Sequence, residues 1–141
     1  MPWEPLDHTA DVGVLVSAGD REMLFAEALR ALTDCITDVE RVRPRTSRAV
    51  DLVAADLELL LVEWLGEALY RFDAEGFLAS EAEVEILDRG DRGLRLAGEM
   101  RGEPHDPERH PHRVAVKAVT YHRLEVARTA AGWTARLIFD I

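Results

Sequence analysis

The stretch DLELLLVEWLGEALYRFDAEG, residues 56–76, decides the fold. Apolar residues recur in it at three- and four-residue spacing, which is the strongest periodic signal in the chain: Leu57, Leu60, Leu61, Trp64, Leu65, Ala68, Leu69 and Phe72. This spacing places the apolar side chains on one face of a helix. Asp56 can cap the first turn of that helix, and Gly76 can end the last turn. We therefore expect this helix to form the core of the protein.

Two strands and a second helix are predicted on the N-terminal side. Residues 11–17 place alternate valines on one face, as in a strand. A helix of about 14 residues follows the capping residue Asp20, with an apolar stripe formed by Leu24, Phe25, Ala28, Leu29, Leu32 and Ile36. Residues 33–45 lose the helical period and contain Pro44, so we interpret them as a connection. A strand over residues 46–53 completes this half.

Four strands are predicted after the central helix. Residues 81–87 and 94–100 alternate charged with apolar side chains around a turn, which indicates a β-hairpin. A polar loop, residues 101–113, separates this hairpin from two further strands at residues 114–126 and 133–141. The order predicts an α+β fold: a single two-layer domain over residues 1–141, with two helices packed on a mixed or antiparallel sheet of about six strands.

Composition excludes some classes of function. The formal net charge of −10 argues against direct, high-affinity binding of nucleic acid, because that affinity comes largely from Lys and Arg displacing counterions. An acidic surface suits basic proteins or metal cations. The sequence contains no Gly-rich phosphate loop and no serine nucleophile elbow, so nucleotide-dependent and serine chemistry are not indicated.

The sequence also indicates a compartment. No early stretch has the pattern of a signal peptide, and no run reaches the roughly 18 apolar residues of a membrane helix. We therefore expect a cytoplasmic protein with no membrane partner. The lone Cys35 falls on the apolar stripe of a predicted helix, which favours a buried, inert thiol over a nucleophile.

A polar cluster precedes the first predicted strand. Asp7, His8 and Asp11 lie within five residues, immediately before the apolar run that starts at Val12. Asp and Thr in such a loop often only form a turn, by hydrogen bonding to nearby backbone amides. The same residues can instead face a shared site at the mouth of the strand. This stretch alone leaves both interpretations open.

The last predicted strand ends in two adjacent carboxylates. Asp140 lies next to the terminal residue Ile141, whose α-carboxylate is also negatively charged at pH 7. A hard cation such as Ca²⁺ or Mg²⁺ would relieve their repulsion, and Asp11 could supply a third carboxylate. The alternative is a frayed, solvated tail. An apolar strand that runs to the last residue disfavours that alternative.

Lys117 is the single lysine among 17 basic residues, the other 16 being arginine. A general preference for arginine explains the majority. The exception indicates either a position that requires a compact primary ammonium, which a planar guanidinium cannot replace, or a lysine that remains by chance. Composition alone does not decide between them.

The polar loop at residues 101–113 carries three histidines: His105, His110 and His112. One hypothesis is a metal-dependent hydrolase in which imidazoles hold Zn²⁺ and Asp106 or Glu103 acts as a base. The spacing matches neither a zinc finger nor H-E-x-x-H, and the prolines favour an exposed loop that contacts a partner. We interpret His122 as a packed or hydrogen-bonded strand residue, with a place beside the metal site as the alternative.

Four motifs occurring in order closely resemble the archease family: DHTADVG at residues 7–13, GEPHD at 102–106, VKAVTYH at 116–122 and IFDI at 138–141. Each motif is weak alone, but their joint occurrence across the whole chain is specific. Archeases assist the GTP-dependent tRNA-splicing RNA ligase, which joins RNA ends bearing a 2′,3′-cyclic phosphate or 3′-phosphate to a 5′-hydroxyl. The resemblance implies a protein activator that promotes guanylylation of the ligase histidine and multiple turnover, and is not itself the ligase.

The resemblance also implies a divalent-metal site, for Ca²⁺ in the first place and for Mg²⁺ or Mn²⁺ as alternatives. By position, its ligands fall on Asp11, Asp140 and the α-carboxylate of Ile141. Support or activation falls on Asp7, His8 and Lys117, and further candidates are Glu103, Asp106 and His122. Two other functions stay open: a general chaperone or specificity modulator of tRNA-processing enzymes, and an independent metal-dependent phosphoesterase.

Overall fold

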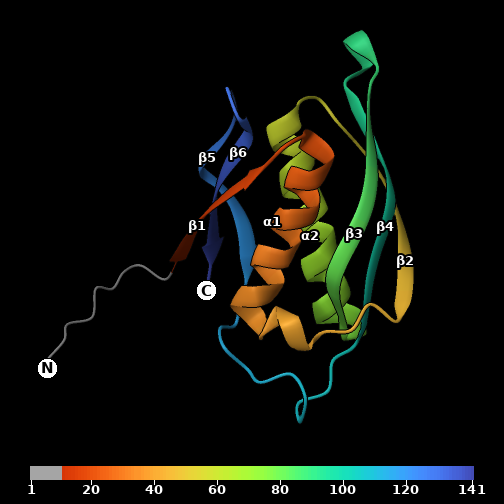
Figure 1. The fold of residues 1–141 in the computed structure, drawn as a ribbon, viewed down its shortest axis with the longest axis vertical. Coiled ribbons are helices and arrows are strands. Elements are labelled where there is room, and N and C mark those ends of the chain that lie inside the picture. Colours follow the sequence, from red (N-terminus) through yellow and green to blue (C-terminus); the bar gives the residue numbers. More distant parts are fainter. Residues whose placement is uncertain (1–10) are drawn as a thin grey trace, which may run out of the picture.

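The computed structural model describes residues 11–141. Two helices, α1 and α2, lie between two three-stranded sheets and contact both of them (Figure 1). The predicted class, with two helices and six strands, is confirmed, and every strand pair is antiparallel. The six strands divide equally between the two sheets instead of forming one. Both helices therefore bury apolar side chains on opposite sides.

Helix α2 (Leu57–Glu75) has the predicted core position and boundaries. The Asp56 side chain accepts a hydrogen bond from the Leu59 N–H at 2.8 Å, which caps the first turn. Gly76 ends the helix in the left-handed region at φ 67°, a conformation that costs glycine little. Trp64 is fully buried, and its indole N–H donates to the Phe25 carbonyl of α1 at 2.9 Å. This bond fixes the two helices against each other.

Helix α1 (Arg21–Ile36) is longer than predicted. The predicted connection from residue 33 was wrong at its start, because the helix continues for another turn and a short 3-10 helix, η1 (Val39–Arg41), follows. Thr33 is buried in this last turn, where its hydroxyl donates to the Ala79 carbonyl at 2.6 Å. A polar residue on the buried face interrupts the apolar period. The neighbouring strand supplies the acceptor that makes this burial favourable.

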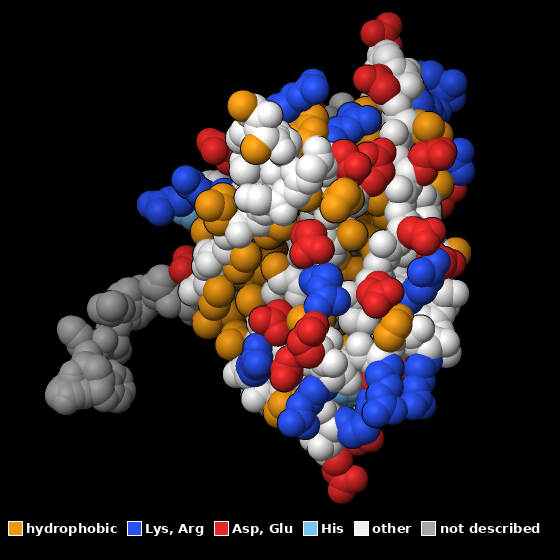
Figure 2. All heavy atoms as spheres, viewed as in Figure 1, with side chains coloured by type: hydrophobic (Ala, Val, Ile, Leu, Met, Phe, Trp, Pro, Cys, Tyr) orange, Lys and Arg blue, Asp and Glu red, His pale blue; other side chains and the backbone are white. Residues whose placement is uncertain are grey.

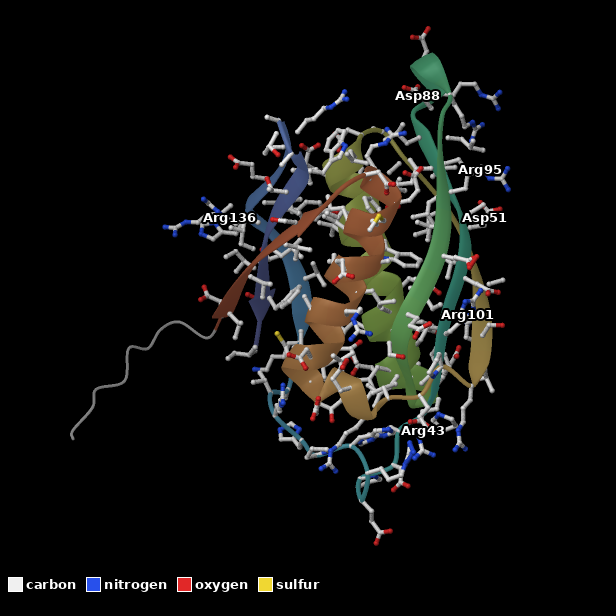
Figure 3. The ribbon with its side chains drawn as sticks, in the orientation of Figure 1. Arg43, Asp51, Asp88, Arg95, Arg101 and Arg136 are labelled. Carbon is white, nitrogen blue, oxygen red and sulfur yellow. The ribbon has the colours of Figure 1, made fainter. Side chains whose placement is uncertain are left out.

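The first sheet has the strand order β2-β4-β3. It consists of β2 (Thr46–Ala54), β4 (Leu94–Pro104) and β3 (Phe77–Asp88). The predicted β3–β4 hairpin is confirmed, and β3 starts earlier, at Phe77, while β4 extends to Pro104, into residues that were predicted to be loop. The face turned away from the helices carries exposed ion pairs such as Asp51 with Arg95 at 2.6 Å (Figure 3). Such pairs contribute little to stability.

The second sheet has the strand order β1-β6-β5. It consists of β1 (Asp11–Ala18), β6 (Gly132–Asp140) and β5 (Ala118–Thr129). The predicted strand start at residue 114 was wrong. The backbone N–H groups of Arg113 and Val114 donate instead to the Ile36 and Cys35 carbonyls at the end of α1, at 3.0 and 3.1 Å. The chain segment after β4 thus crosses the ends of the helices to reach the second sheet (Figure 1).

One hydrophobic core joins residues of both helices and both sheets. The largest fully buried side chains include Trp64, Phe25, Phe77 and Phe139. Cys35 is half-buried, and burial raises the pKa of its thiol, which keeps it protonated and unreactive. Within residues 11–141, neither helix combines the length and the hydropathy needed to cross a membrane.

Candidate functional site

Strand pairing brings the two ends of the described chain together. Asp11, the first residue of β1, is the direct antiparallel partner of Asp140, the last residue of β6. Directly paired residues project from the same face of a sheet, with Cβ atoms roughly 5 Å apart. Figure 1 shows the C-terminus beside the start of β1. Two predicted metal ligands, separated by almost the whole chain, therefore lie next to each other.

These two carboxylates lie on the outer face of the sheet. Leu137 and Phe139 of β6 are fully buried against the helices, so strand alternation turns Asp140 away from the core. Asp11 is also exposed. In the described part of the chain, neither carboxylate accepts a side-chain hydrogen bond or forms an ion pair. Two unpaired carboxylates facing the same way repel each other, and a hard cation would remove that repulsion.

The terminal residue is anchored and does not extend into solvent. Ile141 follows β6 directly, and its partly buried side chain packs against the hydrophobic core. This packing places the end of the described chain beside the core and makes the frayed-tail alternative unfavourable. The α-carboxylate of Ile141 stays a predicted ligand. The predicted supporting residues, Asp7 and His8, lie outside the described residues.

Lys117 is joined to the same edge through its backbone. Its N–H donates to the Asp140 carbonyl at 2.7 Å, just before β5 pairs with β6 at Ala118. Its side chain is exposed. The sequence-predicted lysine thus lies one hydrogen bond away from a predicted metal ligand, and Asp140 lies on the central strand with Asp11 on one side and this segment on the other.

Glu103 has a different environment, near the end of β4. Its carboxylate is 5% exposed and accepts hydrogen bonds from the Arg43 backbone N–H at 2.9 Å, from His110 Nε2 at 2.9 Å and from the Arg109 guanidinium. Burial alone would raise the pKa of Glu103, but these donors outweigh it and lower the pKa to about 2. Glu103 is therefore ionised at neutral pH, with its charge satisfied by groups of the protein itself.

The hydrogen bonds of His110 define its protonation. Its Nδ1 accepts from the Asp106 N–H at 2.8 Å and so carries no proton, whereas its Nε2 lies 2.9 Å from the Glu103 carboxylate. The ring is consequently the neutral tautomer that donates from Nε2. Neither ring nitrogen has a lone pair left for a metal ion. This arrangement weighs against the zinc hypothesis for the histidine-rich loop.

The remaining candidates also have local roles. The Asp106 side chain accepts from the Glu108 N–H at 3.0 Å within a turn, and His105 stacks on His110 with ring centroids 5.8 Å apart. His122 is exposed on β5, where pairing with β6 is interrupted, and its N–H donates to the Thr120 hydroxyl at 3.0 Å. Residues 11–141 contain no group of three His, Cys, Asp or Glu side chains arranged to hold a metal.

Sequence reasoning missed the arginines that surround Glu103. Arg43, Arg45 and Arg109 all approach this carboxylate, by backbone or side chain. The signal for Arg43 and Arg45 was the alternation RVRPR at residues 41–45, which places three guanidinium groups in five residues of an acidic chain. That run was interpreted only as part of a connection.

Comparisons with known proteins agree with the sequence motifs. The profile of the Archease protein family (MTH1598/TM1083) matches residues 3–141. The protein archease of Methanopyrus kandleri is 42% identical over 141 residues, which is the full length of both chains, and that of Pyrococcus furiosus is 36% identical over 140 residues, covering 99% of this chain and 98% of its own.

Solved structures have the same fold. The solution structure of Methanobacterium thermoautotrophicum protein 1598 superposes with a TM-score of 0.78 at 33% identity, covering 96% of each chain. A Thermotoga maritima crystal structure, described as an archease and possible chaperone, has a TM-score of 0.67 at 19% identity and covers 100% of this chain and 98% of its own. At that identity, the second similarity concerns the fold alone.

Proposed function

This chain belongs to the archease family, and from that premise we propose that it is a metal-binding protein activator of the GTP-dependent tRNA-splicing RNA ligase. It promotes guanylylation of the ligase histidine and multiple turnover, and it performs no ligation itself. The observation that carries the proposal is the pairing of Asp11 with Asp140, next to the anchored Ile141. The proposal includes a cytoplasmic location.

The metal site consists of oxygen ligands only. Asp11, Asp140 and the α-carboxylate of Ile141 would hold the ion, and the open outer face leaves its other coordination positions for water or for groups of the ligase. Such an all-oxygen set suits Ca²⁺, Mg²⁺ or Mn²⁺ better than zinc. The bound cation would supply positive charge next to the phosphates of the guanylylation reaction. Lys117, held to Asp140 by its backbone, would present an ammonium to the same region.

The charge of the chain supports a protein partner. A formal charge of −10 favours docking on a basic surface and opposes direct binding to an RNA backbone. The partner, and not this chain, would then hold the RNA. In this arrangement the acidic protein approaches the ligase by electrostatic steering, and its carboxylate edge delivers the cation.

A ligation assay with the ligase of the same organism tests the proposal. We expect Asp140→Asn to abolish stimulation under multiple-turnover conditions, whereas Asp91→Asn, at an exposed aspartate in the β3–β4 turn, retains it. Appending residues after Ile141 converts the α-carboxylate to an amide and should weaken Ca²⁺ binding in calorimetry, while an extension before Met1 should not. Full stimulation by Asp140→Asn would refute the metal-dependent mechanism.

A general chaperone or specificity modulator of tRNA-processing enzymes is the second candidate, and a Thermotoga protein of the same fold is described as a possible chaperone. In this case the carboxylate pair is only structural. The two functions differ in their metal dependence. Protection of several unrelated tRNA-processing enzymes from aggregation, equal for the unmodified protein and Asp140→Asn, would support the chaperone and exclude the first proposal.

A further inference from the structure

A pocket of about 290 Å³ lies away from the carboxylate edge, where the 3-10 helix η1 and the segment between η1 and β2 meet the loop after β4. Its lining residues are Glu40, Arg41, Arg43 and Arg109. Three of these four are arginines in a chain whose formal charge is −10. Lys and Arg side chains gather at this lower end of the molecule (Figure 2), and Arg43 is placed there, on the opposite side from Arg136 of β6 (Figure 3).

The positive charge in this pocket exceeds the negative charge. The Glu40 carboxylate is bound by Arg30, outside the lining, at 2.6 Å. Arg109 shares the Glu103 carboxylate with His110 and lies 4.0 Å from Asp106, and Arg41 lies 3.9 Å from Asp38 at an exposed position. Within residues 11–141, the Arg43 guanidinium forms no ion pair or hydrogen bond. At least one full positive charge is therefore left without a carboxylate partner.

The buried Glu103–His110 pair forms a fixed base for these arginines. Glu103 holds the Arg43 backbone N–H and the Arg109 side chain, while His110, with a fully buried side chain, is held from both ring nitrogens. Two segments far apart in the sequence are thereby locked in one arrangement. The Arg43 backbone and the Arg109 guanidinium are positioned before a ligand arrives, which reduces the entropic cost of binding.

We propose that this pocket binds a phosphomonoester, with the phosphate group held by the guanidinium groups of Arg41, Arg43 and Arg109. Planar guanidinium forks match pairs of phosphate oxygens, and several of them around one dianion give charge-assisted hydrogen bonds on more than one side. The volume lies at the small end of ligand sites and suits a phosphate with little attached mass. This site is independent of the metal-dependent function proposed above.

The chemistry favours a compact anion over a polyanion. The acidic remainder of the molecule repels a strand of RNA or an acidic protein, each of which carries many charges beyond the pocket. A single terminal phosphate places its charge inside the arginine cluster, where attraction dominates. A free phosphorylated metabolite and the phosphorylated end of a short RNA share this chemistry, so the test includes both.

A titration of the full chain tests the proposal, with amide chemical shifts and calorimetry as the readouts. The ligands are inorganic phosphate, a 5′-mononucleotide, and a trinucleotide that ends in either a 3′-phosphate or a 3′-hydroxyl. We expect phosphate to shift the amides around residues 40–45 and 103–110. Arg43→Gln and Arg41→Gln should each raise the dissociation constant by about tenfold or more. Tighter binding of the mononucleotide identifies a metabolite, and tighter binding of the 3′-phosphorylated trinucleotide identifies an RNA end.

The control is Arg92→Gln, at an exposed arginine in the β3–β4 turn at the opposite end of the molecule, which removes the same charge and should leave affinity unchanged. Arg43→Gln leaves the backbone N–H bonded to Glu103, so its thermal unfolding should match that of the unmodified protein. Equal binding of both trinucleotides, unchanged affinity in both pocket variants, or no shift with phosphate would overturn the proposal. Reduced ligase stimulation by Arg43→Gln without phosphate binding would instead assign the cluster to an acidic protein surface.

Discussion

Glu103 and Asp140 are both carboxylates near the ends of β-strands, but their surroundings differ completely. Glu103 is almost fully buried, and donors from three residues converge on its Oε2 atom. Asp140 is exposed on the outer face of its sheet, opposite a second carboxylate, Asp11. The protein itself satisfies Glu103, whereas Asp140 lacks side-chain partners among the described residues. A carboxylate satisfied from within has a structural role, and one that faces another carboxylate is available to a cation.

The largest effect should follow from removing the satisfied carboxylate. Glu103→Ala leaves His110 Nε2–H, the Arg43 N–H and the Arg109 guanidinium without their acceptor, and should lower the free energy of unfolding by about 4 kcal/mol. Urea denaturation measures this loss. Glu85→Ala, at an exposed glutamate on β3, is the matched control and should change stability by less than about 0.5 kcal/mol. Equal stability of the two variants would remove the distinction between the two regions.

Acid should reproduce this loss in the unmodified protein. The pKa of Glu103 falls from 4.5 to about 2 on folding, so its contribution is fully present above about pH 5 and disappears as the pH falls towards 2. The shift corresponds to roughly 3 kcal/mol. We expect the stability difference between the unmodified protein and Glu103→Gln to shrink over this range. A difference that stayed constant between pH 5 and 2 would show that ionisation of Glu103 is not its source.

The stability contributed by Asp140 should depend on a bound cation, whereas that contributed by Glu103 should not. Without a divalent ion, Asp140→Asn should be as stable as the unmodified protein or slightly more stable, since one repulsive charge is gone. Ca²⁺ at about one hundred times its dissociation constant should stabilise only the unmodified protein, by about 2.7 kcal/mol. Thermal unfolding with calcium and then with a chelator measures both terms. If metal-free Asp140→Asn were destabilised as much as Glu103→Ala, Asp140 would have a structural role like that of Glu103, and the contrast between the two carboxylates would be wrong.

The smallest effect on stability is expected at Lys117. Because its side chain is exposed and its link to Asp140 is through the backbone, Lys117→Arg should alter the free energy of unfolding by less than about 0.5 kcal/mol. If the compact ammonium is needed, ligase stimulation should still fall. Undiminished stimulation by Lys117→Arg would show that the single lysine of the chain is there by chance.

The candidate site could be predicted only in part. Asp11, Asp140 and Ile141 stand out in the sequence because of their motifs and the chain end, and strand pairing then brings them together. The same reasoning selected Glu103 and Asp106 as possible bases and the loop histidines as possible ligands. Residue type alone cannot distinguish a metal ligand from a residue that the protein itself hydrogen-bonds. The sequence shows a Glu, Asp or His but not whether other groups of the protein satisfy its carboxylate or imidazole. Burial and hydrogen bonding show that groups of the protein itself satisfy Glu103 and His110.

Local chemistry was sufficient for the elements themselves. These elements depend on neighbours within a few residues, so they are determined by the sequence alone. Examples are the apolar period of residues 57–72, the helix caps Asp56 and Asp20, the helix end at Gly76 and the alternation of the β3–β4 hairpin. Errors arose where a distant group intervened, as when Ala79 accepts the Thr33 hydroxyl or the end of α1 accepts the Arg113 and Val114 amides.

Beyond the β3–β4 hairpin, the tertiary structure alone decided which strands pair. Alternation identifies the buried face of a strand but not its neighbour, because backbone hydrogen bonds are the same for every partner. The division into two sheets, and with it the juxtaposition of Asp11 with Asp140, follows from the segment after β4 crossing the ends of the helices. The sequence determined the helices, the hairpin and the candidate ligands, and long-range packing determined which of those ligands meet.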